Sequence, residues 1–142
     1  MKKKFLVIVQ ARSSSRRFKN KILSDFNGSP LIWSVILSLK KSRLVKKIVV
    51  ATSTDKSDDK LITFLKKKNC SYFRGSLNNV AKRLTNAASL NKSKYFVRIS
   101  GDSPVINHRI IDKVLNWFNN SSNKNWDILT NVFPRTYESG NS

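Results

Sequence analysis

One short segment of the sequence concentrates cations and hydroxyl groups. Residues 10–21, here called the basic loop, read Gln-Ala-Arg-Ser-Ser-Ser-Arg-Arg-Phe-Lys-Asn-Lys and so hold five cations and three serine hydroxyls. Arginine can bind two phosphate oxygens at once, lysine supplies a compact charge, and small residues let backbone N–H groups approach an anion. The composition favours a polyphosphate site. A solvated basic loop explains it equally well, because the segment is not a Walker A sequence.

A second segment contains a carboxylate. Residues 98–104 read Arg-Ile-Ser-Gly-Asp-Ser-Pro. Mg²⁺ needs oxygen ligands and commonly binds proteins through one or two carboxylates together with substrate phosphates, so Asp102 is the best candidate metal ligand. Gly101 would let the backbone turn sharply beside a nucleotide. The alternative explanation is an ordinary Gly-Asp turn.

A third polar segment, Phe-Arg-Gly-Ser at residues 73–76, contains Arg74 and is followed by Arg83. Charged side chains are mostly exposed, so solvated surface charge explains both arginines as well as ligand contact does. His108 lies near the start of a predicted helix with no nucleophile beside it, which favours a surface residue over a general base. Asn107, next to it, is predicted to cap that helix.

Alternating apolar and amphipathic stretches predict the elements that hold these segments. Apolar or β-branched runs indicate strands, and apolar residues spaced by three and four indicate helices. We expect strands at residues 5–9, 47–52, 71–73, 95–99 and 126–129, and helices at 30–39, 57–68, 78–90 and 110–118, the first opened by Pro30 and the second capped by Ser57. This rhythm is typical of an α/β fold with a mainly parallel central sheet flanked by helices.

Ligands of open α/β sheets bind outside the carboxyl ends of the strands. The basic loop and residues 73–76 and 100–104 each come at the end of a predicted strand, so they are the expected binding segments. We expect residues 1–142 to form a single nucleotide-binding domain that is incomplete at its C-terminal side, because the chain stops without a closing element.

The charge balance is unusual. Lys and Arg number 28 against 8 Asp and Glu, a net charge of +20, which raises a nucleic-acid-binding module as an alternative function. The lysines are spread in short clusters, mostly at predicted helix ends, with no long basic arm and no basic stripe interleaved with aromatic residues. We therefore expect no specific nucleic-acid partner.

The sequence also predicts a cellular compartment. It has no run of about 18 apolar residues for a membrane span, and too few apolar residues follow the basic start for a signal peptide. Cys70 is the single cysteine, so it cannot form an internal disulfide, and we expect a buried or half-buried thiol. These features predict a cytoplasmic protein with no membrane partner.

Taken in order, the three polar segments resemble the cytidylyltransferases for acidic sugars, which include spore coat polysaccharide biosynthesis protein F and the acylneuraminate and CMP-KDO enzymes. That family carries Q-A-R-x-x-S-x-R-x-x-x-K-x-L after its first strand, matched here by Gln10, Ala11, Arg12, Ser15, Arg17, Lys21 and Leu23. The later segments match F-R-G-S with a following arginine, and R-I-x-G-D-x-P. Ser14 and Asn20 stand where the family often has glycine, and asparagine tolerates the left-handed backbone that glycine permits.

This resemblance implies a Rossmann-like nucleotidyltransferase that transfers CMP from CTP to an acidic sugar, releases pyrophosphate and serves surface polysaccharide biosynthesis. It implies Mg²⁺ as the cofactor, bound by Asp102, and catalytic roles for Arg12, Lys21 and Asp102. The residues that it assigns to the nucleotide are Gln10, Ala11, Arg12, Ser15, Arg17, Lys21, Arg74, Arg83, Arg98 and Gly101. Asn131 and Arg135 resemble positions near the family's sugar-contacting residues and are assigned to the sugar.

Members of the family continue with further carboxylates and with residues that select the sugar. We therefore hypothesise that this chain is a truncated product that binds nucleotide weakly and turns over poorly, with a homodimer formed through the missing part. The alternatives are a related nucleotidyltransferase or glycosyltransferase that uses another nucleotide, the basic nucleic-acid-binding module, and a catalytically impaired fragment with an assembly role.

Overall fold

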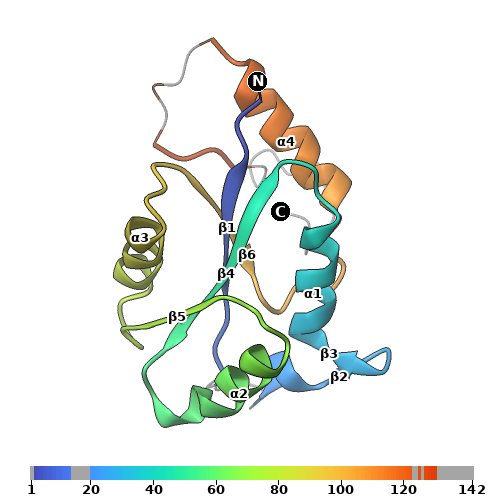
Figure 1. Cartoon of the computed structure of the whole chain (residues 1–142), viewed down its shortest axis with the longest axis vertical. Coiled ribbons are helices and arrows are strands. Elements are labelled where there is room, and N and C mark those ends of the chain that lie inside the picture. The colour runs from blue at the N-terminus through green and yellow to red at the C-terminus, as the bar shows by residue number, and fades with distance from the viewer. Residues whose placement is uncertain (1, 14–19, 123–124, 126, 131–142) are drawn as a thin grey trace.

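The centre of the molecule is a four-stranded parallel sheet (Figure 1). The computed structural model describes residues 2–13, 20–122, 125 and 127–130. The strands are β1 (Phe5–Gln10), β4 (Val45–Ser53), β5 (Tyr72–Gly75) and β6 (Phe96–Ser100), in the spatial order β5-β4-β1-β6. The predicted α/β class is confirmed.

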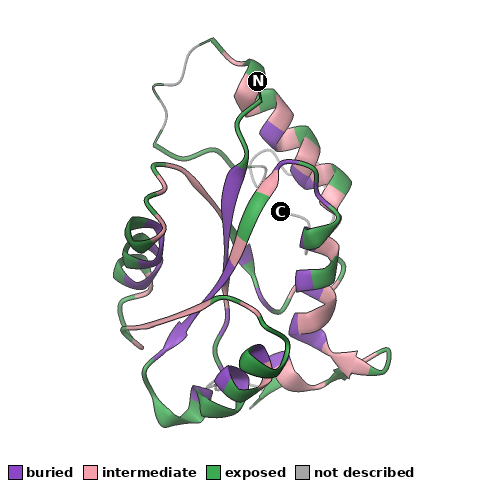
Figure 2. Cartoon of the chain, viewed as in Figure 1, coloured by how far each residue is buried: buried purple, intermediate pink, exposed green. Residues whose placement is uncertain are grey.

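Helices cover both faces of the sheet. They are α1 (Leu31–Lys40), α2 (Asp59–Lys67), α3 (Val80–Leu90) and α4 (His108–Asn120). Alternate residues of β1 enter two cores: Leu6 and Ile8 pack with α3, whereas Phe5, Val7 and Val9 pack with the other helices. Because both faces are covered, β1 is apolar from Phe5 to Val9 rather than alternating, and these residues are buried, as the purple ribbon of β1 in Figure 2 shows.

The order of the strands defines a reversal point in the sheet. From β1 the chain moves through α1 to β4 and through α2 to β5, in one direction across the sheet. It then returns through α3 to β6, on the opposite side of β1. Open α/β sheets bind ligands at the carboxyl ends of the strands where the order reverses, which here is the gap between β1 and β6.

A small hairpin that the sequence prediction missed separates the basic loop from α1. It consists of β2 (Asp25–Phe26) and β3 (Ser29–Pro30), joined by Asn27 and Gly28 with φ of 53° and 84°. An Asn-Gly pair at positive φ is the usual signature of a two-residue hairpin turn, so the sequence did contain the signal. Pro30 precedes α1 directly as its N-cap, in agreement with its predicted place.

The predicted strand at residues 126–129 is wrong for its described part. Residues 127–129 form no strand, and Ile128 is 82% exposed. A short apolar run becomes a strand only when a neighbouring strand accepts its backbone hydrogen bonds, and none of the described strands pairs with it. The other strands and helices lie within a few residues of their predicted ranges.

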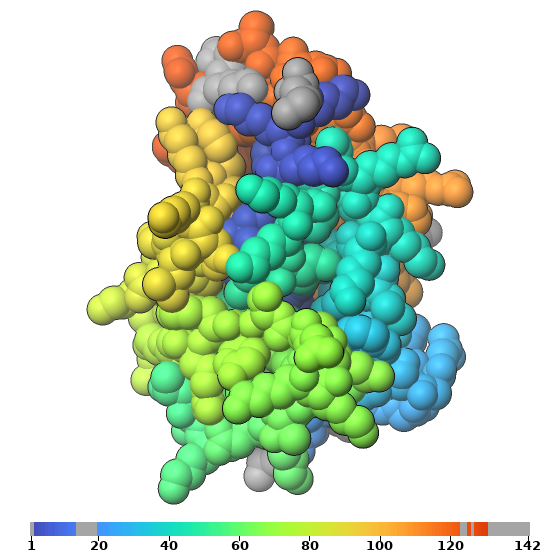
Figure 3. Space-filling model, in the orientation of Figure 1, coloured from blue at the N-terminus to red at the C-terminus, as the bar shows by residue number. Residues whose placement is uncertain are grey.

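The last described helix closes one end of the molecule. The Lys2 ammonium donates to Asn116 Oδ1 at 2.8 Å, and Phe118 packs edge-on against Phe5 and Tyr95. Figure 3 shows the N-terminal residues in blue beside α4 in orange at this end. Of the helices in the described part of the chain, none has the length and apolar character needed to cross a bilayer.

Candidate functional site

The parallel register brings the ends of the strands, and hence the predicted segments, to one edge of the sheet. Gln10 at the end of β1 pairs with Ala51 of β4 and with Ser100 of β6, while Ser53 of β4 pairs with Gly75 of β5. The chain leaves all four strands on the same edge. We call the residues gathered there the strand-end site.

The centre of the strand-end site is an ion pair across the reversal point. The Lys21 ammonium lies 3.4 Å from Asp102 Oδ2, and the two side chains are 46% and 45% exposed. Ser100 Oγ donates to the other carboxylate oxygen at 2.6 Å. The Ser100 hydrogen bond, helped by the Lys21 charge and opposed by burial, holds the pKa of Asp102 below its ordinary value. Two predicted catalytic residues therefore meet here, one cationic and one a solvent-accessible carboxylate.

A second polar pair joins β1 to β6. Arg98 on β6 donates from Nε to Gln10 Oε1 at 2.9 Å. Ala11 is buried, and its N–H donates to Ala51 O at 3.2 Å. Arg12 follows directly and is exposed, so its guanidinium is accessible to a ligand.

Gly101 is required for a different reason from the predicted one. Its N–H donates to Gln10 O at 2.8 Å, and a Cβ added to it would lie 2.9 Å from Ala11 Cβ and 3.0 Å from Gln10 O. Gly28 is the only described glycine with a φ in the left-handed region. The close packing of β6 on the end of β1, and not a left-handed turn, therefore excludes a side chain at Gly101.

A buried carboxylate within the predicted second helix supports the basic loop. Asp58 belongs to a 3-10 turn, η2 (Lys56–Asp58), and is fully buried. Its Oδ1 accepts the Ser13 N–H at 2.5 Å, and its Oδ2 accepts the Ser53 N–H at 3.1 Å and the Ser53 hydroxyl. Burial would raise the pKa of Asp58, but the hydrogen bonds from Ser13 and Ser53 outweigh it and hold the pKa below its ordinary value.

The predicted cap of the second helix, Ser57, is wrong. Ser57 lies inside η2, which Asp55 caps by accepting the Ser57 N–H at 2.8 Å, and α2 follows with Asp58 as its N-cap residue and no side-chain capping bond. The predicted cap of the last helix is confirmed, because Asn107 Oδ1 accepts the Arg109 N–H at 2.9 Å.

Asn20 closes the basic loop on its other side. The Asn20 N–H donates to Ser13 O at 3.0 Å, and Asn20 has a φ of 59°. The expectation that asparagine replaces glycine in a left-handed conformation is thus confirmed. Lys21 follows immediately, as the first residue of a 3-10 turn, η1 (Lys21–Leu23).

Arg83 lies under the strand-end site and not on its surface. The side chain is fully buried, and Nη1 donates to Ser76 O at 2.5 Å and to Leu77 O at 3.3 Å. Nε and Nη2 have no hydrogen-bond partner in the described structure. Burial and the charge of Arg12 lower the pKa of Arg83, and the charge of Asp58 opposes them. Contact between Arg83 and a nucleotide stays a prediction.

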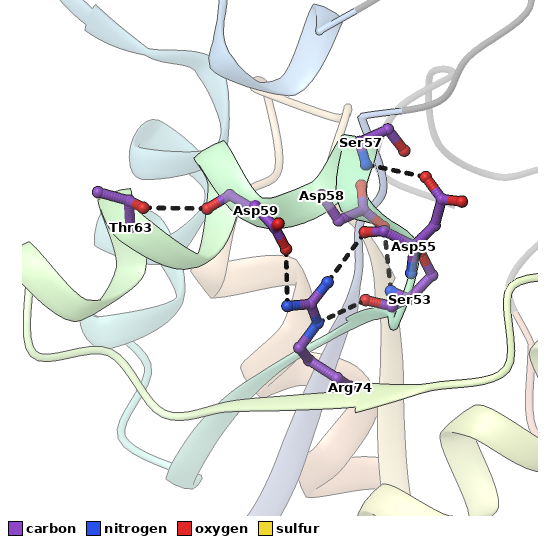
Figure 4. A network of polar contacts seen from close by, with 7 residues as sticks. All are labelled: Ser53, Asp55, Ser57, Asp58, Asp59, Thr63 and Arg74. Carbon is purple, nitrogen blue, oxygen red and sulfur yellow. Dashed lines mark hydrogen bonds and ion pairs between the residues drawn. The ribbon is translucent and has the colours of Figure 1, made fainter.

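Arg74 binds the protein with every part of its guanidinium (Figure 4). Nε donates to Ser53 O at 2.8 Å, Nη2 donates to Asp55 O at 2.9 Å, and Nη1 pairs with Asp59 Oδ1 at 2.8 Å. These contacts tie β5 to the connection between β4 and α2. A nucleotide-binding role for Arg74 also stays a prediction, and its visible role is structural.

We expect Arg74→Ala to lower the free energy of unfolding by about 1–2 kcal/mol, because it removes two hydrogen bonds from a charged donor and one partly exposed ion pair. Urea unfolding followed by circular dichroism would measure this. Lys60→Ala, which removes an exposed cation from α2, is the matched control. A loss no larger than that of Lys60→Ala would contradict the structural role.

Four predicted ligand residues, Ser15, Arg17, Asn131 and Arg135, lie outside the described residues. The described residues contain no group of three or more His, Cys, Asp or Glu side chains that could hold a metal ion. Mg²⁺ needs only one or two protein carboxylates when substrate phosphates complete its shell, and a half-exposed Asp102 oxygen that already faces a cation fits this requirement.

Comparisons with known proteins agree with one another. The family model described as Cytidylyltransferase matches residues 6–139. The chain is 32% identical to 3-deoxy-manno-octulosonate cytidylyltransferase of Chlorobaculum parvum, covering 75% of this chain and 42% of that protein. It is 28% identical to spore coat polysaccharide biosynthesis protein SpsF of Bacillus subtilis, covering 78% and 48%.

A solved structure of a cytidylyltransferase from Leptospira borgpetersenii superposes with a TM-score of 0.77 at 32% identity. That alignment covers 86% of this chain and 51% of the other. The chain therefore spans about half the length of the relatives that it matches.

Proposed function

Because this chain belongs to the cytidylyltransferase family, we propose that its strand-end site binds CTP with Mg²⁺ for transfer of CMP to an acidic sugar. The observation that carries the proposal is the Lys21–Asp102 pair at the reversal point between β1 and β6. A cation and an accessible carboxylate side by side match what a nucleoside triphosphate with its metal requires.

Four residues of the strand-end site have roles in this proposal. Arg12 and Lys21 would neutralise the charge that gathers on the departing pyrophosphate while an incoming hydroxyl approaches the α-phosphorus in line. Asp102 would hold Mg²⁺, which would supply positive charge to stabilise the phosphate groups. Ser100 keeps the carboxylate of Asp102 oriented and ionised.

The names of the relatives support an acidic sugar as the acceptor. One acts on 3-deoxy-manno-octulosonate, and another serves spore coat polysaccharide biosynthesis. We propose the same substrate class and a role in surface polysaccharide synthesis for the whole protein, with Asn131 and Arg135 near the sugar. We place the reaction in the cytoplasm, where CTP is available.

A nucleotide panel tests the proposal. With Mg²⁺ present, CTP should raise the melting temperature of the chain more than ATP, GTP or UTP does, because a ligand at 100 times its Kd stabilises the folded state by about 2.7 kcal/mol. Differential scanning fluorimetry measures the shift. Equal shifts for all four nucleotides would contradict cytosine selectivity, and no shift would contradict nucleotide binding.

The net charge of +20 motivates one competing function, nucleic-acid binding. That function predicts DNA or RNA affinity that falls steeply with salt and does not change in Asp102→Ala.

Pyrophosphate release from CTP and 3-deoxy-manno-octulosonate tests turnover directly. Release at ordinary enzyme rates would show that the hypothesis of an impaired fragment is wrong.

A further inference from the structure

We propose that Asp58 is a positioning residue that fixes both ends of the basic loop and thereby places Arg12 and Lys21 for phosphate binding. The inference rests on the proposed function, because it assigns a use to the two cations that Asp58 positions. Asp58 itself is fully buried, so it would act through the basic loop and not by touching the nucleotide.

The contacts of Asp58 are all directed away from its own helix. It is the N-cap residue of α2, yet its side chain makes no capping hydrogen bond to that helix. Its carboxylate instead accepts N–H groups from Ser13 and Ser53, which belong to two different strand-end segments. Helix capping therefore does not explain why a charge is buried at this place.

A chain of hydrogen bonds leads from Asp58 to the ion pair of the strand-end site. Asp58 holds the Ser13 N–H, and Ser13 O in turn accepts the Asn20 N–H at 3.0 Å. Arg12 directly precedes Ser13, and Lys21 directly follows Asn20. One carboxylate thus fixes the backbone beside both cations, and Lys21 reaches Asp102 from there.

The burial of the surroundings makes this arrangement rigid. Ser13 is 2% exposed, and Ser53 and Arg83 are fully buried. Because the Asp58 carboxylate is itself buried and accepts hydrogen bonds from two backbone N–H groups, it has little freedom to move.

Amide hydrogen exchange on the free 142-residue chain tests the positioning role without any nucleotide. In Asp58→Asn and Asp58→Ala we expect the amides of Ser13 and Asn20 to exchange at least roughly 10-fold faster than in the wild type. Alanine removes the acceptor of the Ser13 N–H, and asparagine offers one neutral oxygen to the three donors that now share the carboxylate, so Ser13 and the Asn20 N–H bonded to its carbonyl lose their support. Ser53→Ala is the matched control: it removes one hydroxyl contact of Asp58 but leaves the bond to Ser13, so these amides should keep their protection.

A double-mutant cycle then connects the loop to the ligand. Asp58→Asn should weaken Mg²⁺–CTP binding, measured by calorimetry, by roughly 10-fold, because a displaced cation no longer meets its phosphate. In a Lys21→Ala background the same substitution should change affinity less than about threefold, since part of what Asp58 positions is already gone. A role in stability alone would give the same loss in both backgrounds.

The outcomes separate the two proposals. Unchanged exchange at Ser13 and Asn20 in both Asp58 variants would overturn the positioning role, as would equal affinity losses with and without Lys21. A wild-type chain that binds no nucleotide would overturn the proposed function, while the exchange measurement would still decide whether Asp58 holds the basic loop. If Asp58→Ala does not fold, Asp58→Asn, which keeps the side-chain volume, carries both measurements.

Discussion

Asp102→Ala should abolish the increase in CTP affinity that Mg²⁺ produces, a loss of roughly 10–100-fold judged from the effect of disturbing metal sites. Asp102 is the carboxylate that faces both Lys21 and the reversal point of the sheet, and Mg²⁺ accepts few protein ligands beyond one or two carboxylates. Titration calorimetry with CTP, in the presence of Mg²⁺ and of a chelator, measures the difference directly.

Controls distinguish a metal site from a general loss of charge. Asp127→Ala removes an exposed carboxylate outside the strand-end segments and should leave the Mg²⁺ dependence intact. Asp102→Ala should change the melting temperature of the free protein little, because a half-exposed ion pair contributes at most about 1 kcal/mol. A Mg²⁺ effect that survives in Asp102→Ala would show that another residue holds the metal.

Gly101→Val should lower the free energy of unfolding by about 3 kcal/mol, at the upper end of the usual effect of overpacking. The added Cβ would lie 2.9 Å from Ala11 Cβ and 3.0 Å from Gln10 O, so β6 must shift away from the end of β1. CTP binding should weaken with it, because this contact sets the distance between the basic loop and Asp102. Urea unfolding and calorimetry on the same preparation measure both effects.

A substitution at Ala11 should relieve part of the clash that a side chain at residue 101 creates. Gly101→Ala should destabilise less than Gly101→Val, and Ala11→Gly should recover part of the Gly101→Ala loss by removing one of the two clashing atoms. The carbonyl of Gln10 remains in place, so recovery should be incomplete. If Gly101→Ala leaves the free energy of unfolding unchanged, both with Ala11 and with Ala11→Gly, the close-packing explanation is wrong.

The fold and the centre of the site were largely predictable from local patterns. A continuous apolar run predicts a strand buried on both faces, and the structure confirms this for β1. An apolar stripe predicts a helix buried on one face, and the structure confirms this for α1 and α4. Lys21 and Asp102 belong to two segments that were both predicted to lie at the binding site, and the structure brings the two side chains into contact. Periodicity and strand-end position are local signals, so they survive without tertiary information.

Other residues could not be predicted because their contacts cross long stretches of sequence. Asp58 and Asp59 are adjacent acids near the start of a predicted helix, yet Asp58 is fully buried and Asp59 is exposed. Arg74 and Arg83 read as ligands or as surface charge, but one binds backbone carbonyls and Asp59 and the other is buried beneath the site. Residues 127–129 failed as a strand because pairing depends on a neighbour that local sequence does not specify.

The sequence by itself determined the order of strands and helices, the family and the chemistry of the residues at the strand ends. Tertiary structure alone decided which of these residues meet: it placed β6 beside β1, so that Lys21 and Asp102 became neighbours across 81 positions. It also turned Asp58 toward Ser13 across 45 positions. The physical reason is that periodicity records whether a residue faces the core or water, whereas a buried hydrogen bond depends on which distant donor the packing brings within reach.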